Sequence, residues 1–320
     1  MTDKNPQISI VIPLYNEEEG FGLLIDRLNT LIKNSELSIE VVMVNDGSRD
    51  KTPLLMNELA LTDNHYQCVF LARNHGHQLA LTAGLSFVNC TEAVFIIDGD
   101  LQDPPELLGR FYEKFSEGFE VIYGIRRKRK EGVIKKFAYW FYYRLLKNIS
   151  NIDIPLDSGD FALLSRRVVD HLNEMPERSR FIRGMRTWIG FRQTGLEYER
   201  DARSAGEAKY TFKMLFNLAY NGIFNFSEFP VKFITRIGML TMLGAFVFFV
   251  YVAIKKYLIG GVPPGYTSLF LAISIFSGVQ LLALGLIGEY VLRIYDQVRN
   301  RPLFIVDKVI KNKELQKNNS

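Results

Sequence analysis

Two aspartates, Asp98 and Asp100, are separated by a single glycine in the segment FIIDGDLQDPPE, directly after an apolar run. The run is typical of a buried strand, and an extended backbone around Gly99 points both carboxylates to one side. Carboxylate oxygens are the ligands that Mg²⁺ or Mn²⁺ prefers, and Gln102 can add a carbonyl oxygen or contact a phosphate. A metal held by two protein carboxylates completes its coordination with water and substrate phosphates. The motif therefore indicates a metal site that takes a nucleoside diphosphate.

Two other apolar runs strengthen this motif, which taken alone also fits a loop with two solvated acids. VIPLYNEE brings Pro13, Tyr15 and Glu17 to the end of the first run, and VNDGSRD brings Asp46 to the end of the second. In parallel sheets, ligands bind beyond the carboxyl ends of the strands. We therefore expect three acid-bearing strand ends to meet at one edge of a sheet.

Strand-like and helix-like segments alternate from residue 8 to about residue 125. This alternation predicts an α/β fold with a doubly wound, mostly parallel sheet. Asn16 and Glu19 are spaced as a capping box at one helix start, and Asp103 precedes Pro104 at another. We interpret Asp103 as a helix cap rather than a metal ligand. The predicted strands cover residues 8–14, 39–45, 68–73, 93–98 and 120–125.

Two C-terminal segments, 237–254 and 267–288, contain no charged residue. Each is long enough to cross a bilayer as a helix, and helices of a soluble hairpin rarely lack every charge over such a length. Lys232 and Arg236 precede the first segment, and further basic residues follow the second. The positive-inside rule then places both termini in the cytoplasm.

Two further segments, 133–147 and 210–229, carry apolar residues at helical spacing together with basic and aromatic residues. An ordinary core-facing helix would explain either one, but beside membrane spans an interfacial helix is favoured. The final segment, 311–320, has a composition typical of disorder. The predicted order is a cytoplasmic α/β catalytic domain over 1–209, amphipathic interfacial helices over 210–232, two transmembrane helices over 233–295 and a cytoplasmic tail over 296–320.

The charge of the whole chain is nearly balanced. Its 320 residues include 39 basic and 35 acidic side chains, a formal charge of +4, which argues against a nucleic-acid binder. Cys68 and Cys90 lie in apolar surroundings and are predicted to be free thiols in a reducing compartment. The polar opening lacks the pattern of a cleaved leader, so we expect the N-terminus to stay on the side where it is made.

Taken in order, these motifs resemble the nucleotide-sugar glycosyltransferases of family 2, which have the GT-A fold. The resemblance covers roughly residues 8–302 and is specific for the polyprenyl-phosphate subgroup, which includes bactoprenol glucosyltransferases and dolichol-phosphate mannose synthases. It also depends on ARNHGHQLALTAGL, GIRRKRKEG, LDSGDFALLSRRVV, PERSRFIRGMRTWIGFRQ and RDARSAGEAKYTFKML. It implies nucleotide-sugar binding by Pro13, Tyr15, Glu17, Asp46, Asp98 and His77.

The resemblance implies an inverting transfer of a hexose to a polyprenyl phosphate, with UDP-glucose as the first donor and undecaprenyl phosphate as the first acceptor. A lipid phosphate has a second pKa of about 6, so it is largely a dianion near neutral pH and needs little help from a base. Its approach to a diphosphate requires positive charge, and the arginine fork suits phosphate oxygens. The candidates for binding the acceptor phosphate are Arg126, Arg144, Arg200, Arg203 and Lys209.

Asp160, in DSGDF, is the first candidate for a base or an orienting acid at the reacting centre, and Asp157 is the second. Arg126 joins them as a candidate catalytic residue because it would face the incoming phosphate. A turn or cap is the alternative role for Asp160, since DSG is typical of a turn.

Two departures from the usual family pattern concern the donor sugar. Relatives commonly read RNFGKE where this chain has RNHGHQ, and they often have an arginine at the position of Ala162. Other donors, such as GDP-mannose, UDP-GlcNAc or an aminoarabinose type, are therefore alternatives, as is a membrane scaffold without catalysis. RGMRTW does not match the Q-x-x-R-W signature of processive polysaccharide synthases.

The expected location is the bacterial cytoplasmic membrane, with a multi-pass anchor and membrane lipid as a partner. Homo-oligomers built through the C-terminal spans are compatible with the sequence.

Overall fold

The computed structural model describes residues 5–126, 158–199, 229–259 and 265–316. The chain divides into two compact units. The sheet unit comprises Met1–Lys147, Ile152–Ala219 and Arg301–Ser320, and the helical unit comprises Asn148–Asn151 and Tyr220–Asn300. The predicted interfacial segment 133–147 lies outside the described residues, and so does 210–229 except for residue 229, where α9 begins.

The sheet unit is built on a mixed sheet whose described strands run in the order β7-β5-β6-β4-β1-β2-β3-β8-β9. Its centre is parallel, because β1 pairs in parallel with β2 and β4, and β2 with β3. β6 is antiparallel to β4 and β5, whereas β7 is parallel to β5. The strands are β1 (Ile8–Leu14), β2 (Ile39–Asn45), β3 (Tyr66–Leu71), β4 (Ala93–Ile96), β5 (Val121–Arg126), β6 (Ser158–Ser165), β7 (Gln193–Tyr198), β8 (Val306–Lys311) and β9 (Glu314–Gln316).

Helices cover both faces of this sheet, which explains why its central strands β1 and β4 are buried along their whole length. Ile10 of β1 belongs to a core cluster with Leu24 of α1 and Phe111 of α4. Val11, the next residue, faces α3, where a Cβ added at Gly84 would lie 2.4 Å from its Cγ1. The helices are α1 (Glu18–Asn34), α2 (Thr52–Thr62), α3 (His77–Ser86), the short 3₁₀ helix η1 (Pro105–Leu107), α4 (Leu108–Ser116), α6 (Arg166–Glu174) and α7 (Ile182–Trp188).

The predicted capping box at Asn16 and Glu19 is wrong. Asn16 has a left-handed backbone with φ 52, and the side chain of Glu17 at the N-cap position makes no capping hydrogen bond. The Glu17 N–H donates to Thr52 Oγ1 at 2.9 Å, and the Arg49 N–H donates to Asn16 Oδ1 at 2.8 Å. The loops after β1 and β2 therefore satisfy each other's polar groups, a tertiary arrangement that local spacing does not reveal.

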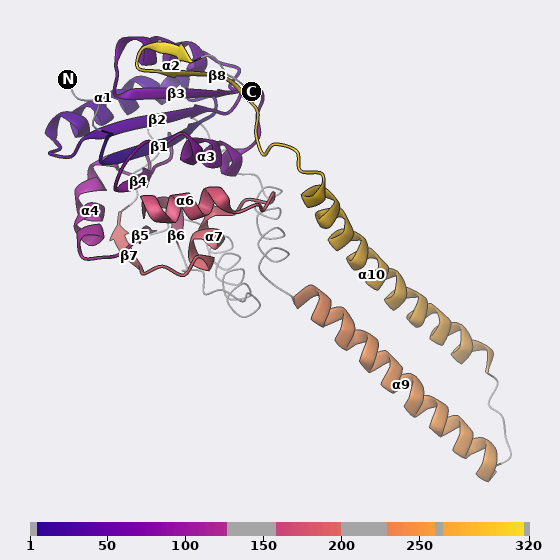
Figure 1. Ribbon diagram of the computed structural model, residues 1–320. Coiled ribbons are helices and arrows are strands. Elements are labelled where there is room, and N and C mark those ends of the chain that lie inside the picture. Colours follow the sequence, from indigo (N-terminus) through magenta and orange to yellow (C-terminus); the bar gives the residue numbers. More distant parts are fainter. Residues whose placement is uncertain (1–4, 127–157, 200–228, 260–264, 317–320) are drawn as a thin grey trace. The chain divides into compact units, whose positions relative to one another are not determined.

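The end of the chain also differs from the prediction of a separate, partly disordered tail over 296–320. β8 pairs antiparallel with β3, and β9 pairs with β8 (Figure 1). Ile310 of β8 is 1% exposed and belongs to the core cluster. Without β8, the edge of β3 would have unpaired backbone groups. β8 pairs with this edge, and residues 301–316 therefore belong to the sheet unit.

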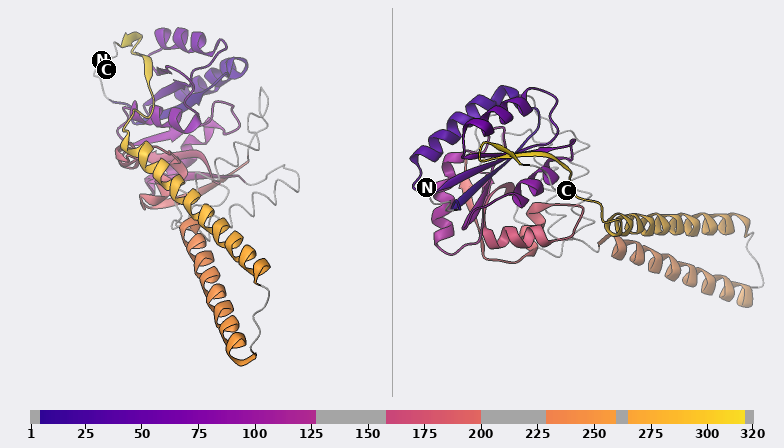
Figure 2. Two further views of the ribbon diagram at one scale, coloured as in Figure 1. Left: turned by 90° about the vertical axis from the view of Figure 1, so that its right-hand side faces the viewer. Right: turned by 45° about the horizontal axis from the view of Figure 1, so that its top comes forward.

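The helical unit contains α9 (Phe229–Ile259) and α10 (Tyr266–Val298), which run antiparallel and side by side (Figures 1 and 2). Both are long and apolar enough to cross a membrane, with candidate spans at Pro230–Tyr251 and Ile275–Val298. None of the apolar window of either span is buried inside the protein. The helices contain the predicted spans and extend beyond them.

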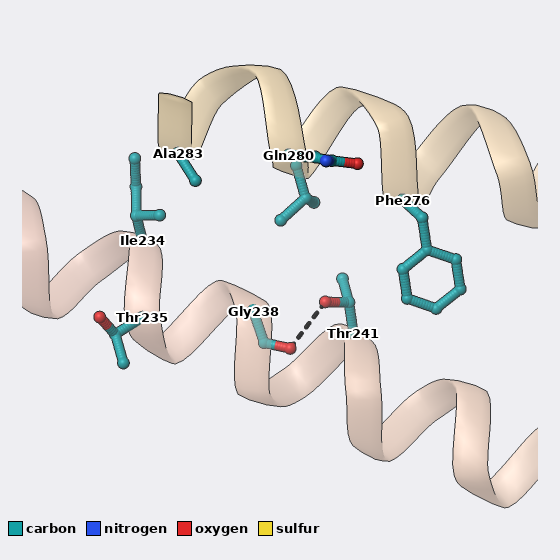
Figure 3. A pocket seen from close by; sticks show the side chains of 8 residues that line it. Ile234, Thr235, Gly238, Thr241, Phe276, Gln280 and Ala283 are labelled. Carbon is teal, nitrogen blue, oxygen red and sulfur yellow. Dashed lines mark hydrogen bonds between the residues drawn. The ribbon is translucent and has the colours of Figure 1, made fainter. Parts of the chain in front are cut away.

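A pocket of about 450 Å³ lies between α9 and α10 (Figure 3). Within it, Thr241 Oγ1 donates to the Gly238 carbonyl oxygen of its own helix at 2.8 Å. Its lining residues are Ile234, Thr235, Gly238, Thr241, Phe276, Val279, Gln280 and Ala283.

Candidate active site

The two aspartates of the D-x-D motif lie in the loop after β4, as predicted. Asp100 Oδ1 accepts a hydrogen bond from the Gln102 backbone N–H at 3.2 Å, and Leu101 between them has a left-handed backbone with φ 56. A Cβ at Gly99 would lie 2.3 Å from Cδ2 of the buried Leu14, so a larger residue would force the Leu14 side chain to move. The motif is thus packed against the neighbouring strand.

Asp46 follows β2 at the same edge of the sheet. Its carboxylate is 3% exposed and accepts the backbone N–H groups of His75 at 2.7 Å and Gly76 at 2.9 Å. Burial raises the pKa of Asp46 although both hydrogen bonds oppose the shift. At Gly47, with φ 65, a Cβ would lie 2.5 Å from the backbone of Arg73, so only glycine fits. Asp46 therefore fixes the loop that leads into α3.

The other predicted nucleotide residues, Pro13, Tyr15 and Glu17, lie at the end of β1 and in the loop after it. Pro13 is buried in the sheet, whereas Tyr15 and Glu17 are partly exposed. The Asp46 N–H donates to the Leu14 carbonyl oxygen at 2.9 Å, which joins the ends of β1 and β2. The structure brings the acid-bearing strand ends to one edge, and their role in nucleotide binding stays a prediction.

Asp160 lies at the start of β6, which is antiparallel to β4 and therefore begins at the edge where β4 ends. It is 4% exposed and accepts hydrogen bonds from Arg183 Nε at 2.9 Å and Nη2 at 3.2 Å. Gln78 Nε2 also donates to it, at 2.9 Å. Burial favours the neutral acid, but the charges and hydrogen bonds of Arg183 and His77 hold the pKa of Asp160 well below its usual value.

His77, the first residue of α3, lies between Asp98, which follows β4, and Asp160 of β6. Its Nε2 is 3.4 Å from Asp160 Oδ2 and 3.7 Å from Asp98 Oδ1. Burial disfavours its charged form, yet the hydrogen bond to Asp160 and the charges of both aspartates raise the pKa of His77 to about 9. A protonated His77 can therefore bridge Asp98 and Asp160 at neutral pH.

Asp103 is not the helix cap that was predicted. Tyr198 of β7 donates a hydrogen bond of 2.5 Å to its Oδ1, and the residue is 0% exposed. No side chain caps the start of η1. The local pattern D-P-P-E fits a cap, but a partner 95 residues later in the chain takes the carboxylate instead.

Sequence reasoning gave no role to Gln78 or Arg183, although both contact Asp160. Gln78 Oε1 also accepts the Ile182 backbone N–H at 2.9 Å and so joins α3 to α7. Both residues lie in quoted motifs, but contacts across 82 and 23 residues leave no signal in a single sequence.

The other predicted site residues cannot be placed. Arg126 is the last residue of β5, and the structure does not describe its side chain. Asp157, Arg144, Arg200, Arg203 and Lys209 lie outside the described residues.

The charges at this edge fit a divalent cation held by few protein ligands. Burial, followed by the charges of Asp103, Asp100 and Asp160, raises the pKa of Asp98 to about 6, against the opposing charge of His77. Such crowding of acids is relieved by a cation. Within the described part of the chain no group of three or more His, Cys, Asp or Glu residues could hold a metal. Two carboxylates suffice only where substrate phosphates and water complete the coordination.

Comparison with known proteins places the chain in a family. The model of glycosyl transferase family 2 matches residues 9–172. An uncharacterized glycosyltransferase of Bacillus subtilis is 42% identical over 97% of this chain and 96% of its own length. The bactoprenol glucosyl transferase of Shigella phage SfII is 38% identical over 94% of this chain and 98% of its own.

Among solved structures, mannosyl-3-phosphoglycerate synthase from Rubrobacter xylanophilus matches with a TM-score of 0.46 and 18% identity, over 68% of this chain and 72% of its own. The family model spans half of the chain, and the curated relatives extend over nearly all of it. The chain belongs to glycosyl transferase family 2, and it has the predicted α/β fold with a mixed, mostly parallel sheet.

Proposed function

We propose that this glycosyltransferase transfers a hexose from a nucleotide sugar to a polyprenyl phosphate. Glucose is the first candidate for this hexose. The observation that carries the proposal is the meeting of Asp46, Asp98 and Asp160 at the carboxyl edge of one sheet. Similarity to relatives such as the phage bactoprenol glucosyl transferase supports the lipid acceptor. UDP-glucose is the proposed donor and undecaprenyl phosphate the proposed acceptor.

Asp98 and Asp100, with Gln102 beside them, would hold Mg²⁺ or Mn²⁺. When bound, the cation would supply positive charge to the departing diphosphate. Pro13, Tyr15, Glu17 and Asp46 would form the nucleotide side of the pocket, as the family resemblance implies. The crowding of carboxylates around Asp98 supports a cation at this position.

Asp160 would orient its neighbours rather than accept a proton. It is ionised and surrounded by donors from Arg183, Gln78 and His77, so it is a weak base. The acceptor phosphate is largely a dianion near neutral pH and can attack the anomeric carbon without a base. Asp160 therefore fixes the positive groups that face the reacting anions, and the transfer proceeds by single displacement with inversion.

The helical unit would anchor the enzyme as a two-span protein, with the catalytic domain and both termini in the cytoplasm of a bacterium. The candidate spans of α9 and α10 support this arrangement. Arg126, Arg144, Arg200, Arg203 and Lys209 would hold the acceptor phosphate near the membrane, and copies of the chain would associate through the spans.

The test uses purified full-length protein in detergent with undecaprenyl phosphate, Mg²⁺ or Mn²⁺, and labelled UDP-glucose, UDP-GlcNAc and GDP-mannose. We expect label from UDP-glucose in the organic phase, and none after chelation of the metal. Transfer from another sugar nucleotide would support the lipid acceptor and identify that nucleotide sugar, in place of UDP-glucose, as the donor. Nucleotide binding without any transfer would favour the membrane scaffold.

Another donor is the second candidate because the departure from RNFGKE falls at the reacting edge. His77 and Gln78, which stand in place of the usual lysine and glutamate, both contact Asp160. A donor panel with the variant H77K/Q78E tests whether this pair selects the sugar. A change in the preferred donor would show that the pair selects the sugar, and an unchanged preference would show that it does not.

A further inference from the structure

Two arginines of the sheet unit are buried to a similar extent but differ in their hydrogen bonds. Arg180 is 7% exposed, and all three of its guanidinium nitrogens have an acceptor. Nη1 donates to the Met175 carbonyl oxygen at 2.8 Å, Nη2 to that of Leu172 at 2.7 Å, and Nε to Thr82 Oγ1 at 3.4 Å. Arg180 is therefore a structural residue that closes the turn after α6.

Arg186, on α7, is 1% exposed and has only one protein acceptor among the described residues. Its Nη2 donates to the Gly159 carbonyl oxygen at 3.1 Å. Its Nε and Nη1 are buried and have no hydrogen-bond partner in the described part of the chain. The guanidinium lies 5.5 Å from the centre of the Tyr123 ring. A buried cation with unused donors is unfavourable unless something else compensates it.

The nearby acid does not provide this compensation. Asp160 attracts Arg186, but its carboxylate is already held by the fork of Arg183 and by Gln78. Burial lowers the pKa of Arg186 to about 10, which still leaves it charged at neutral pH. One carboxylate thus serves two arginines, so α7 carries one more positive charge than Asp160 alone balances.

The position of this surplus indicates its ligand. Arg183 and Arg186 are three residues apart and share one face of α7. Gly159, which Arg186 contacts, precedes Asp160, and His77 joins Asp160 to Asp98. Both substrates of the proposed reaction bring phosphoryl groups to this edge. A phosphoryl group has several acceptor oxygens, and a site shielded from water strengthens its attraction to a guanidinium.

We propose that Arg186, beside Arg183, forms a binding subsite for a phosphoryl group of the substrates and uses the donors on its Nε and Nη1. This inference deepens the proposed function and rests on it. The phosphoryl group belongs either to the donor diphosphate or to the acceptor phosphate monoester. The subsite accounts for two buried donors, Nε and Nη1, that have no hydrogen-bond partner in the described part of the chain.

The experiment compares full-length wild-type protein with Arg186→Met, Arg186→Lys and the matched variant Arg180→Met. Thermal unfolding in detergent is measured without ligand, and then with UDP and Mg²⁺ or with farnesyl phosphate as a short acceptor analogue. Without ligand, we expect Arg180→Met to lower the melting temperature because it leaves two backbone carbonyls unpaired. Arg186→Met should keep it near the wild-type value or raise it, because an uncompensated buried charge is removed.

With ligand, we expect Arg186→Met to weaken binding of one probe by about tenfold or more, and Arg186→Lys to restore part of that loss because it retains the charge. Weaker binding of UDP alone assigns the subsite to the donor, and weaker binding of farnesyl phosphate alone assigns it to the acceptor. Arg180→Met should bind both probes as the wild type does. Wild-type affinity of Arg186→Met for both probes would overturn the inference, as would a loss of stability equal to that of Arg180→Met.

The same measurements separate this inference from the proposed function. If wild-type protein binds UDP through Arg186 but transfers no sugar, the subsite stands and the proposed reaction falls. If wild-type protein transfers glucose to the lipid and Arg186→Met matches it in affinity and in KM for both substrates, the reaction stands and the subsite falls.

Discussion

The sheet unit and the helical unit differ in how far their apolar side chains are exposed. In the sheet unit Val42 and Phe95 are 0% exposed, and the charged Asp160 is also buried, at 4%. In the helical unit Phe249 and Leu281 are 68% and 69% exposed. The first unit hides apolar groups from water and shields a few paired charges, whereas the second presents apolar groups outward.

The difference shows that the two units are suited to different surroundings. Apolar faces of this extent are unfavourable in water and favourable in lipid, so the helices need a membrane or a partner to cover them. In the sheet unit, a shielded charge interacts strongly with its neighbours, which suits binding of anionic substrates. Changes in one unit should therefore leave the property of the other unaffected, and five experiments test this separation.

The largest effect is expected from deleting residues 301–320, which removes β8 and β9 from the sheet. Burial of Val309 and Ile310 at about 1.5–3 kcal/mol each predicts a loss of about 3–6 kcal/mol in the free energy of unfolding. Denaturant unfolding in detergent measures the loss. Deletion of 317–320 alone is the control. Equal stability of the two truncations would mean that these strands do not belong to the sheet unit.

Asp100→Ala should reduce sugar transfer by about 100-fold or more, because it removes one of two carboxylates for the cation. Membrane association should not change. The matched control is Asp170→Ala, which removes an exposed acid paired with Arg166 on α6 at 2.8 Å. The measurement is the initial rate of sugar transfer with saturating substrates. Activity within twofold of the wild type in Asp100→Ala would count against the metal site.

Leu281→Arg tests the helical unit alone. A charge near the middle of a membrane helix costs about 2.5–3.5 kcal/mol, so less protein should reach the membrane fraction. Leu54→Arg, at a leucine of α2 that is 65% exposed, is the matched control in the sheet unit. The comparison fails if both variants partition in the same way.

Tyr198→Phe should lower the free energy of unfolding of the sheet unit by about 1–3 kcal/mol, because it takes a hydrogen bond from the buried carboxylate of Asp103. Tyr112→Phe, which removes a bond of 2.6 Å to the partly exposed Glu92, should cost less. Denaturant unfolding ranks the two variants. The reverse order would show that Asp103 is not stabilised by Tyr198.

The smallest effect concerns pH in the metal-free protein. His77 has a folded pKa of about 9, above its unfolded value of about 6.5, so its pairing with Asp160 stabilises the fold fully below pH 6.5. This contribution is lost as the pH rises through about 9. The difference in melting temperature between wild type and His77→Gln, measured with chelator, should shrink over this window. A constant difference would contradict the pairing.

Local patterns in the sequence were enough to predict the parallel sheet and the position of its acids. Strand ends such as those before Asp46 and Asp98 meet because parallel strands share an edge, a rule that needs no knowledge of distant contacts. The same reasoning failed for Asp103, whose cap-like surroundings are overridden by Tyr198 from β7. It also failed for the last strands, because a short segment of mixed apolar and charged residues gives no sign of the edge it will cover.

Motifs and periodic patterns along the chain are enough to predict the family, the α/β sheet and the two long apolar helices. The role of Asp160 depends instead on contacts that form on folding. Its partners Gln78 and Arg183 come from α3 and α7, which meet it through folding rather than through sequence spacing. Shielding from water then sets the charges of Asp160, His77 and Arg186, and this depends on what the folded chain packs around each group.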